Sequence, residues 1–222
     1  MELTLEQKVE RLQDTQKVKN LMSSYSYYQY AHEHTKVLEL FSKRDDAFVD
    51  SEGMGIYEGQ SGLKRFLVDW QWQLDGDAKG SYNEHFFTTE VVEVAKDGKT
   101  ARGLWMSPGC ETRRVKSKNG GLEAFWVWCK YAVDFIKEDG EWKIWHMRIP
   151  YDVICDYHHS WVDEGCIDYV TDIMYDGEKP TADRPSGFEP TLFSQEKVTN
   201  LFFAPPSPYE TEADIQDLWK KK

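Results

Sequence analysis

Apolar residues recur every three or four positions through the N-terminal part of the chain, with Lys, Gln and Glu between them. The apolar positions are Leu5, Val9, Leu12, Val18, Leu21, Met22, Tyr25 and Tyr28. Such spacing places side chains on one face, so the sequence predicts a long amphipathic helix over residues 3–31. A second, short helix is predicted over TKVLELFSK, and a third over QSGLKRFLVDWQWQL, whose apolar stripe is Leu63, Phe66, Leu67 and Trp70.

After Gly80 the pattern changes to β-branched and aromatic residues in four runs. These are NEHFFTTEVVEVA, TARGLWMSPGCETRRV, LEAFWVWCKYAVDFI and EWKIWHMRIPYDV, and they predict strands. The connections KDGK and KEDGE are hairpin signals because of their Asp-Gly pairs, and KSKNGG predicts a longer polar loop with an Asn-Gly. We therefore expect an antiparallel meander. A shorter strand, DAFVDS, precedes the third helix. Helices followed by hairpins predict an α+β fold, with three helices packed on a strongly curved antiparallel sheet.

The last third of the chain has a different composition. Seven of the eight prolines lie at or after Pro150, and DGEKPTADRPSGFEP shows no apolar period. Its aromatic residues are too many for a disordered linker. We therefore expect residues 1–152 to form the folded domain and residues 153–222 an extended arm that packs on the body or on a neighbouring subunit. Within the arm, we expect LFFAPPSPY near a pocket entrance or across a subunit boundary.

The net charge is −12, and residues 151–222 hold most of it, with fifteen Asp and Glu against six Lys and Arg. Because binding to phosphates needs clustered basic residues, this balance argues against a nucleic-acid partner. No apolar run is long enough to cross a membrane, and the N-terminus is charged from Glu2 onward. The sequence thus predicts a soluble, cytoplasmic protein without a membrane contact.

The four cysteines show no CxxC spacing, so we expect reduced thiols. The run CDYHHSWVDEGC contains four residues of metal-ligating type, Cys155, His158, His159 and Cys166. Their spacing matches no standard zinc pattern, and adjacent histidines cannot easily face one ion, so we expect no metal. The chain also has no Gly-rich phosphate loop, and we expect no cofactor.

The order of elements, the YEGQSGLKRFL segment, His85 seven residues before Val92 and the DGEWKI hairpin resemble the nuclear transport factor 2-like superfamily, in its SnoaL-like enzyme branch. The resemblance covers about residues 5–152. It implies a cone whose curved sheet and helices enclose a mostly apolar pocket. Members of the superfamily include dehydratases, isomerases, lyases and non-enzymatic binders. Related cones pair through their sheets, so we expect a homodimer or homotrimer.

In such a cone the end of the first helix forms one wall of the pocket. Tyr25, Tyr28 and His32 stand at i, i+3 and i+7, so we expect them to line the cavity together. The alternative is that the rings are ordinary core. The resemblance implies that His85 is the general acid or base. Against this, a lone histidine on a strand is often only a hydrogen-bonded polar residue.

The strand WKIWHMRI carries two further candidates. His146 and Arg148 share a face with two apolar neighbours, so we expect both at the pocket mouth, where Arg148 can bind an oxyanion. The alternative is that Arg148 pairs with a surface carboxylate. We expect Trp105 to form part of the aromatic wall of the pocket. Alternation places Trp126 and Trp128 on one face of their strand but leaves open whether that face lies inside.

The sequence departs from the dehydratases that it resembles. At the end of the first helix they carry a carboxylate where this chain has Tyr30, which we expect to contact substrate. A second acid would fall near Gly109, and only Glu111 is close. The prediction is a cofactor-independent lyase that eliminates water or formaldehyde from a hydrophobic, oxygenated aromatic or polycyclic small molecule. His85 would move the proton, while Tyr25 and Arg148 hold the oxyanion. The alternatives are a non-catalytic binding or protein-interaction module and a ketosteroid-isomerase-like isomerase.

Overall fold

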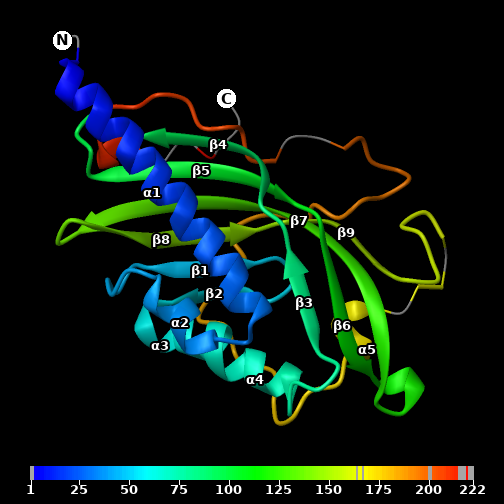
Figure 1. Ribbon diagram of the computed structural model, residues 1–222. Helices are drawn as coiled ribbons and strands as arrows, with labels where there is room; N and C mark the ends of the chain where they lie inside the picture. The colour runs from blue at the N-terminus through cyan, green and yellow to red at the C-terminus, as the bar shows by residue number, and fades with distance from the viewer. Residues whose placement is uncertain (1–2, 164, 167, 200–201, 215–218, 220–222) are drawn as a thin grey trace.

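The computed structural model describes residues 3–163, 165–166, 168–199, 202–214 and 219. In this part of the chain one nine-stranded sheet is covered on one side by helices (Figure 1). The helices are α1 (Leu5–Tyr30), α2 (His34–Glu39), α3 (Gly59–Lys64), a π-helical turn (Arg65–Asp69), α4 (Trp70–Asp75) and α5 (Tyr169–Asp172), with short 3-10 turns at Lys116–Lys118 and Glu212–Asp214. The strands are β1 (Phe48–Ser51), β2 (Gly55–Glu58), β3 (Tyr82–His85), β4 (Thr88–Val94), β5 (Thr100–Ser107), β6 (Gly109–Val115), β7 (Gly121–Glu138), β8 (Glu141–Ile149) and β9 (Tyr151–Asp156).

Helix α1 crosses the sheet and extends beyond it at its N-terminal end (Figure 1). Its buried part begins at Asp14, which accepts hydrogen bonds from Trp142 Nε1 at 2.9 Å and Lys137 Nζ at 2.6 Å. Val18 and Met22 then pack in the core. The earlier apolar positions remain exposed, namely Leu5, Val9 and Leu12. The predicted helix is therefore confirmed, but only its second half uses its apolar face.

The third predicted helix is one continuous segment from α3 through the π-helical turn to α4, and its predicted apolar stripe is buried. The predicted strand DAFVDS becomes β1, and it pairs with two neighbours. Strand β2 pairs with it antiparallel, and β8 pairs with it parallel. The sheet is thus mixed, whereas hairpin signals alone predict an antiparallel one. The α+β class is confirmed.

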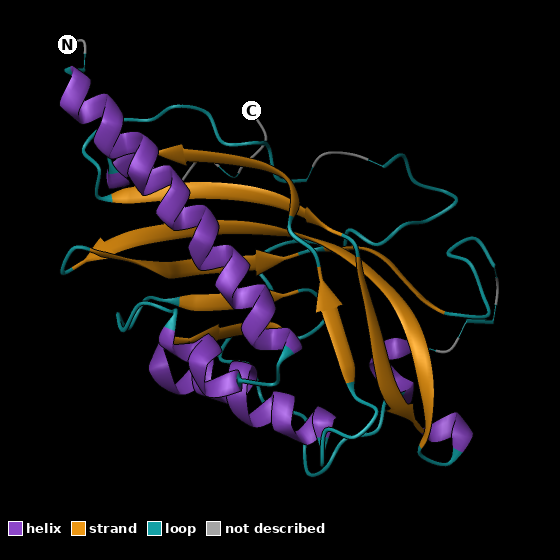
Figure 2. Cartoon of the chain, in the orientation of Figure 1, coloured by secondary structure: helices purple, strands orange, loops and turns teal. Residues whose placement is uncertain are grey.

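Three bends give the sheet its curvature (Figure 2). Strands β3 and β4 are separated by Phe86 and Phe87, β5 and β6 by Pro108, and β8 and β9 by Pro150. Proline cannot donate a ladder hydrogen bond, so it suits such breaks. Strand β7 runs unbroken through both halves, pairing with β6 and β9 near its start and with β5 and β8 toward its end. The concave side of this curl faces the helices.

The inward face of β7 is set by its burial pattern. Phe125 and Val127 are buried, whereas Trp126 and Trp128 are about 40% exposed. The question that alternation left open is therefore decided: the two tryptophans point outward.

A β-bulge in β8 changes which residues face the core. Asp134 of β7 lies opposite His146, but the next residue, Phe135, lies opposite Ile144, so Trp145 is the extra residue. Because one inserted residue reverses the alternation, His146 and Arg148 point to the face opposite the helices. The expectation that they share a face with Trp142 and Ile144 is wrong for this reason.

The C-terminal arm wraps around the body. Ile56 N donates to Arg184 O at 2.8 Å, and Phe193 N donates to Asp152 O at 2.9 Å. Farther along, Phe203 and Trp219 cover Leu104 and Ala132 on the sheet face opposite the helices. Most of LFFAPPSPY therefore lies on that face instead of at a pocket entrance; Leu201 is outside the described residues.

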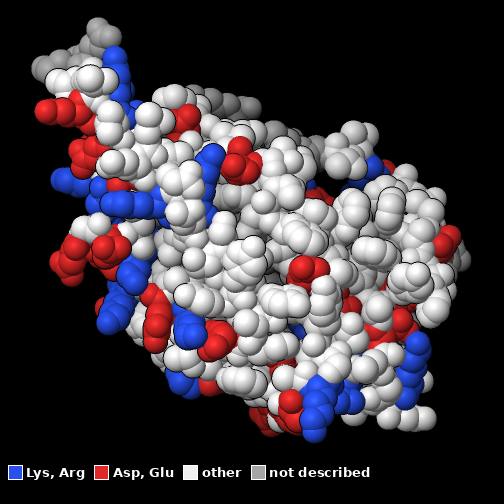
Figure 3. Space-filling view, viewed as in Figure 1, with Lys and Arg blue, Asp and Glu red and all other residues white. Residues whose placement is uncertain are grey.

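Charged side chains of both signs lie intermingled on the face shown in Figure 3. Lys19 pairs with Glu90 and Arg11 with Glu93, each at 3.0 Å, along the contact between α1 and β4. Among the helices of the described residues, none is long and apolar enough to cross a bilayer.

Candidate active site

A cavity of about 270 Å³ lies between the end of α1, helices α3 to α4, the curved sheet and the arm. Its wall is mainly apolar and aromatic, with contributions from Phe66, Trp70, Phe87, Ile149, Ile173 and Leu192. A concave, mostly apolar space with few polar groups is the usual form of a small-molecule site. The arm supplies the side of the wall formed by residues 169–192.

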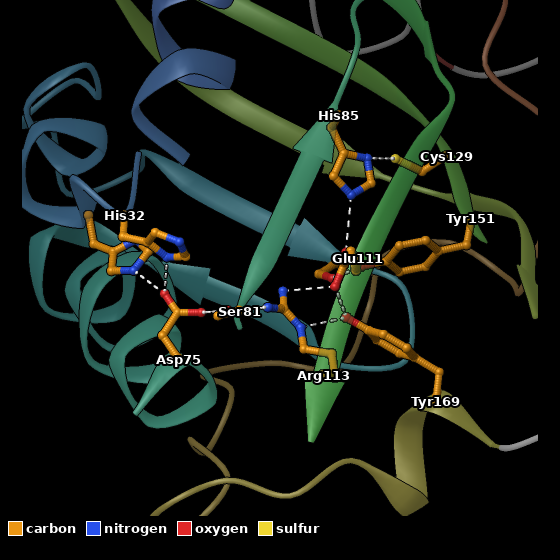
Figure 4. Close-up of polar contacts among 11 residues, drawn as sticks. His32, Asp75, Ser81, His85, Glu111, Arg113, Cys129, Tyr151 and Tyr169 are labelled. Atoms are coloured by element: carbon orange, nitrogen blue, oxygen red, sulfur yellow. Dashed lines mark hydrogen bonds and ion pairs between the residues drawn. The ribbon is translucent and has the colours of Figure 1, made fainter. Parts of the chain in front are cut away.

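His85 and Glu111 form a pair inside this cavity (Figure 4). His85 ends β3, and its Nε2 lies 3.1 Å from Oε1 of Glu111 on the neighbouring β6. Gly109 stands opposite His85 in this ladder. A Cβ atom on Gly109 would lie 2.4 Å from His85 Nδ1, so the glycine leaves the space that the imidazole occupies.

The second oxygen of Glu111 is held by two further groups. Arg113 Nη2 lies 2.8 Å from Oε2, and the hydroxyl of Tyr169 donates a hydrogen bond to the same atom. Arg113 also pairs with Asp75 at 3.5 Å, and Ser81 Oγ donates to that aspartate at 2.7 Å. Since Tyr169 belongs to α5, the arm helps to position the carboxylate of the site.

The pair is ionised at neutral pH. Burial raises the pKa of Glu111, but the charge of Arg113 and the hydrogen bond from His85 outweigh it and lower this pKa to about 2. Burial likewise lowers the pKa of His85, yet its hydrogen bonds with Cys129 and Glu111 raise it to about 10. His85 is therefore an imidazolium beside a carboxylate, and its neutral form becomes more populated as the pH rises.

The other side of the imidazole ring is also fixed. His85 Nδ1 lies 3.4 Å from Ser107 Oγ and 3.8 Å from Cys129 Sγ, while Ser26 Oγ donates to the backbone oxygen of His85 at 2.6 Å. Contacts to both nitrogens hold the ring in one orientation, as a proton-transferring group requires.

Phenol groups surround the pair. Burial raises the pKa of Tyr25 to about 12, and it also raises the pKa values of Tyr131 and Tyr151. All three therefore keep their O–H donors at neutral pH. Two amide oxygens in the wall, Gln29 Oε1 and Asn83 Oδ1, have no hydrogen-bond partner among the described residues. A ligand that carries hydroxyl groups would satisfy them.

Of the N-terminal candidates, only Tyr25 lines the cavity. Tyr28 packs beside the core under Lys36 Nζ, and Tyr30 is half-exposed against Tyr82. Helix α1 ends at Tyr30, so the i+7 spacing to His32 does not hold. His32 adopts a left-handed φ of 56° and places Nδ1 2.6 Å from Asp75 Oδ2.

The remaining candidates also lie outside the cavity wall. Trp105 is buried in the core between Phe87 and Phe135. His146 and Arg148 contact Asp134 at 3.1 and 3.0 Å on the opposite face, because the bulge at Trp145 turns them away. Arg148 thus pairs with a carboxylate, as in the alternative considered for it, but this carboxylate is buried and does not lie at the surface. The guanidinium beside the site belongs to Arg113 instead.

Sequence reasoning missed most partners of His85. Glu111 stands two residues after Gly109, where the resemblance pointed to a second acid, and alternation puts Arg113 on the same strand face. That local signal could have identified both residues. Tyr169 comes from a point 58 residues beyond Glu111, and no local pattern connects the two.

Two groups in the described residues have the ligand types of a metal site. One is His32, His34 and Asp75. The other is Asp156, His159 and Cys166, which all belong to the CDYHHSWVDEGC run. In each group the ligand atoms lie within 4.8 Å of one another. As they stand, His32 and His34 share one oxygen of Asp75, while Arg113 and Ser81 contact its other oxygen.

A curved mixed sheet, covering helices and a buried histidine–carboxylate pair in an aromatic cavity define an α+β cone with an enclosed candidate active site. The family of the SnoaL-like domain matches residues 10–148, and the chain belongs to this family. The match ends where β8 ends, so the arm lies outside it.

Solved structures show the same fold. One, described as a candidate scytalone dehydratase from Novosphingobium aromaticivorans, is 16% identical with a TM-score of 0.55, covering 72% of this chain and 99% of its own. Another is the hexachlorocyclohexane dehydrochlorinase LinA-type3 from Novosphingobium barchaimii, also 16% identical with a TM-score of 0.55, covering 70% and 99%. At this identity the likeness concerns the fold alone. Among curated proteins, no sequence matches the chain.

Proposed function

We propose that this protein is a cofactor-independent lyase that acts on a hydrophobic, oxygenated aromatic or polycyclic small molecule and releases water or a one-carbon unit such as formaldehyde. The observation that carries the proposal is the buried His85–Glu111 pair facing an aromatic cavity. Elimination needs a group that moves a proton and donors that stabilise a developing oxyanion. His85 is the first, and the phenols of Tyr25, Tyr131 and Tyr151 offer the second.

In the proposed mechanism of water loss, neutral His85 takes a proton from substrate carbon, and a C=C bond forms as the neighbouring C–O bond breaks. Glu111 stabilises the imidazolium that results. The imidazolium then returns the proton to the leaving oxygen. Glu111 stays ionised throughout, because Arg113 and Tyr169 hold its second oxygen. Arg113 supports the carboxylate, so the oxyanion role expected of Arg148 passes to the phenols.

The structural neighbours support the reaction type. A dehydratase and a dehydrochlorinase carry out eliminations, of water and of hydrogen chloride respectively, and both names occur among the chains of this fold. The unpartnered oxygens of Gln29 and Asn83 favour a substrate with hydroxyl groups. The largely apolar wall favours aromatic rings as the body of the substrate.

The test is to incubate the purified protein, without added cofactor, with a panel of phenolic dimers and steroids and to follow products by mass spectrometry. His85→Gln should lower turnover by about 10²- to 10⁴-fold while ligand binding persists, as expected for lost acid–base catalysis. His158→Gln is the matched control, because His158 is absent from the cavity wall. Full activity in His85→Gln would remove His85 from the mechanism.

The same assay separates the alternative functions. A product lighter than the substrate by water or formaldehyde indicates a lyase, whereas a product of unchanged mass indicates an isomerase. A ligand that binds but returns unchanged indicates a non-catalytic carrier. The lyase is favoured over a carrier because binding alone does not need an ion pair held in one orientation by four neighbouring side chains.

A further inference from the structure

Cys129, His85 and Glu111 form a row of side chains in the cavity, in which His85 contacts the other two (Figure 4). Cys129 Sγ lies 3.8 Å from His85 Nδ1, and His85 Nε2 lies 3.1 Å from Glu111 Oε1. A thiol, an imidazole and a carboxylate in this order form the arrangement that activates a nucleophile: the base contacts the thiol, and the acid orients the base. The proposed elimination uses His85 and Glu111 but gives the thiol no role.

We propose that Cys129 is a nucleophile that adds reversibly to α,β-unsaturated carbonyl compounds bound in the cavity. This inference rests on the small-molecule cavity of the proposed function, although it does not require the elimination reaction. The two are chemically related, since loss of water beside a carbonyl produces an enone.

The position of Cys129 suits this role. It lies on β7 at the bend of the sheet, opposite Ser107 of β5 on one side and Tyr151 of β9 on the other. Tyr131, two residues along the same strand, lines the cavity beside it. A carbonyl compound held against Cys129 would therefore have phenol donors near its oxygen, where an addition reaction develops negative charge.

Among the described residues, the other cysteines have no hydrogen bond to a histidine ring, although Cys166 Sγ lies within 4.8 Å of a ring nitrogen of His159 and an oxygen of Asp156. All four lie in the described residues, and Cys129 is the one whose sulfur is hydrogen-bonded to a histidine ring. Burial raises the pKa values of Cys110, Cys155 and Cys166, and nearby carboxylates add to the effect. Their thiolates are disfavoured, so they provide internal references for the reactivity of Cys129.

The addition balances without a further reagent. When His85 is neutral, the proton of Cys129 passes to its Nδ1, and the thiolate forms a C–S bond with the β carbon of the enone. The C=C electron pair moves toward the carbonyl, giving an enolate whose oxygen accepts a hydrogen bond from a phenol of Tyr131 or Tyr151. The imidazolium then protonates the α carbon. The net change is addition of S–H across the double bond, and the reverse steps release the enone.

The experiment uses the full chain with 2-cyclohexenone and, in parallel, with iodoacetamide, followed by digestion and mass spectrometry of each cysteine peptide. We expect an enone adduct on Cys129, and alkylation of Cys129 at least about 10-fold faster than that of the equally buried Cys155.

His85→Gln should remove both the adduct and the fast alkylation, and His158→Gln should keep both. The comparison of Cys129 with Cys155 is made on the unaltered chain, so it does not depend on the folding of a variant. Alkylation of Cys129 no faster than that of Cys155, or the absence of an enone adduct on Cys129, would overturn the proposal. An adduct without elimination products would contradict only the lyase proposal. Elimination products without an adduct would contradict only the proposal that Cys129 is a nucleophile.

Discussion

At the scale of single residues, the chemistry of His85 is decided by what touches its two nitrogens. Nε2 faces the Glu111 carboxylate, and Nδ1 faces Ser107 and Cys129. Burial alone would favour the neutral imidazole, but these contacts raise its pKa to about 10. A base that is mostly protonated at neutral pH gains activity as the pH rises toward its pKa.

Glu111→Gln should therefore move the rising limb of kcat/KM against pH to lower pH. The variant keeps a hydrogen-bonding side chain but loses the negative charge that favours imidazolium, so the pKa of His85 moves toward its ordinary value of about 6.5. The limiting rate should fall, since the imidazolium intermediate is less stabilised. Tyr169→Phe retains the carboxylate and should shift the limb less. An unchanged midpoint in Glu111→Gln would contradict the pairing.

At the scale of elements, the bends of the sheet bring His85 and Glu111 together. Strand β3 ends at His85 and β6 begins at Gly109, so the site lies at the break that Pro108 makes between β5 and β6. The bulge in β8 acts in the opposite sense, because it carries Arg148 away from the cavity and against Asp134.

Gly109→Ala tests the first of these effects, the placement of His85 beside Glu111 at the break between β5 and β6. The new methyl group would lie 2.4 Å from His85 Nδ1 and 2.9 Å from the backbone oxygen of Glu84, so the imidazole must leave its present position and its geometry with Glu111 changes. We expect a stability loss of about 1–3 kcal/mol and a large fall in turnover. Gly140→Ala is the control: its φ of 83° makes alanine cost about 1 kcal/mol, yet open space surrounds it. Stability is measured by urea unfolding and turnover on the same samples.

Arg148→Gln tests the second effect, the displacement of Arg148 from the cavity by the bulge in β8. Asp134 is fully buried and accepts from Arg148, Arg102 and Trp219, so losing one charged donor should lower the free energy of unfolding by about 1.5–3 kcal/mol. Turnover of the folded protein should stay unchanged. If turnover instead fell by about 10-fold or more at unaltered stability, Arg148 would return to the catalytic machinery.

At the scale of the whole molecule, the arm has two separate tasks. Residues 169–192 contribute to the cavity wall, and Tyr169 holds Glu111. Beyond them, Phe203 and Trp219 cover the opposite sheet face, where the Trp219 ring lies 4.0 Å from the guanidinium of the buried Arg102. The homo-oligomer expected from the resemblance stays a prediction, and light scattering would test it by a mass above 26.0 kDa.

Two truncations should separate the tasks. Deleting residues 195–222 exposes Leu104 and Ala132 and removes Phe203 and Trp219, so it should lower the free energy of unfolding by about 3 kcal/mol or more while keeping the cavity wall. Deleting residues 169–222 should in addition raise KM and reduce turnover. Thermal unfolding and steady-state kinetics of both forms give the comparison. Equal activity in the two would show that the wall segment contributes nothing to the site.

Much of the fold follows from local pattern. A few neighbouring residues are enough to predict the apolar period of α1, the apolar stripe of α3 to α4 and the hairpin turns. The same is true of the burial of Val18, Met22 and Leu63. The class of the fold could therefore be predicted, and the resemblance to SnoaL-like enzymes added the pocket position of His85 and Tyr25. Hydrophobic periodicity and turn chemistry act over one or two turns or strands, which is why a single sequence records them.

The site itself was decided by tertiary structure. The bulge at Trp145 depends on how β8 pairs with β7, and one extra residue moves His146 and Arg148 to the other face without changing the local pattern. Likewise, the partners of His85 come from β5, β6 and β7, and they determine its pKa only once the chain has folded, while α5 holds Glu111. Sequence periodicity records which face of a strand is apolar, whereas register and electrostatic environment arise from contacts between segments far apart in the chain.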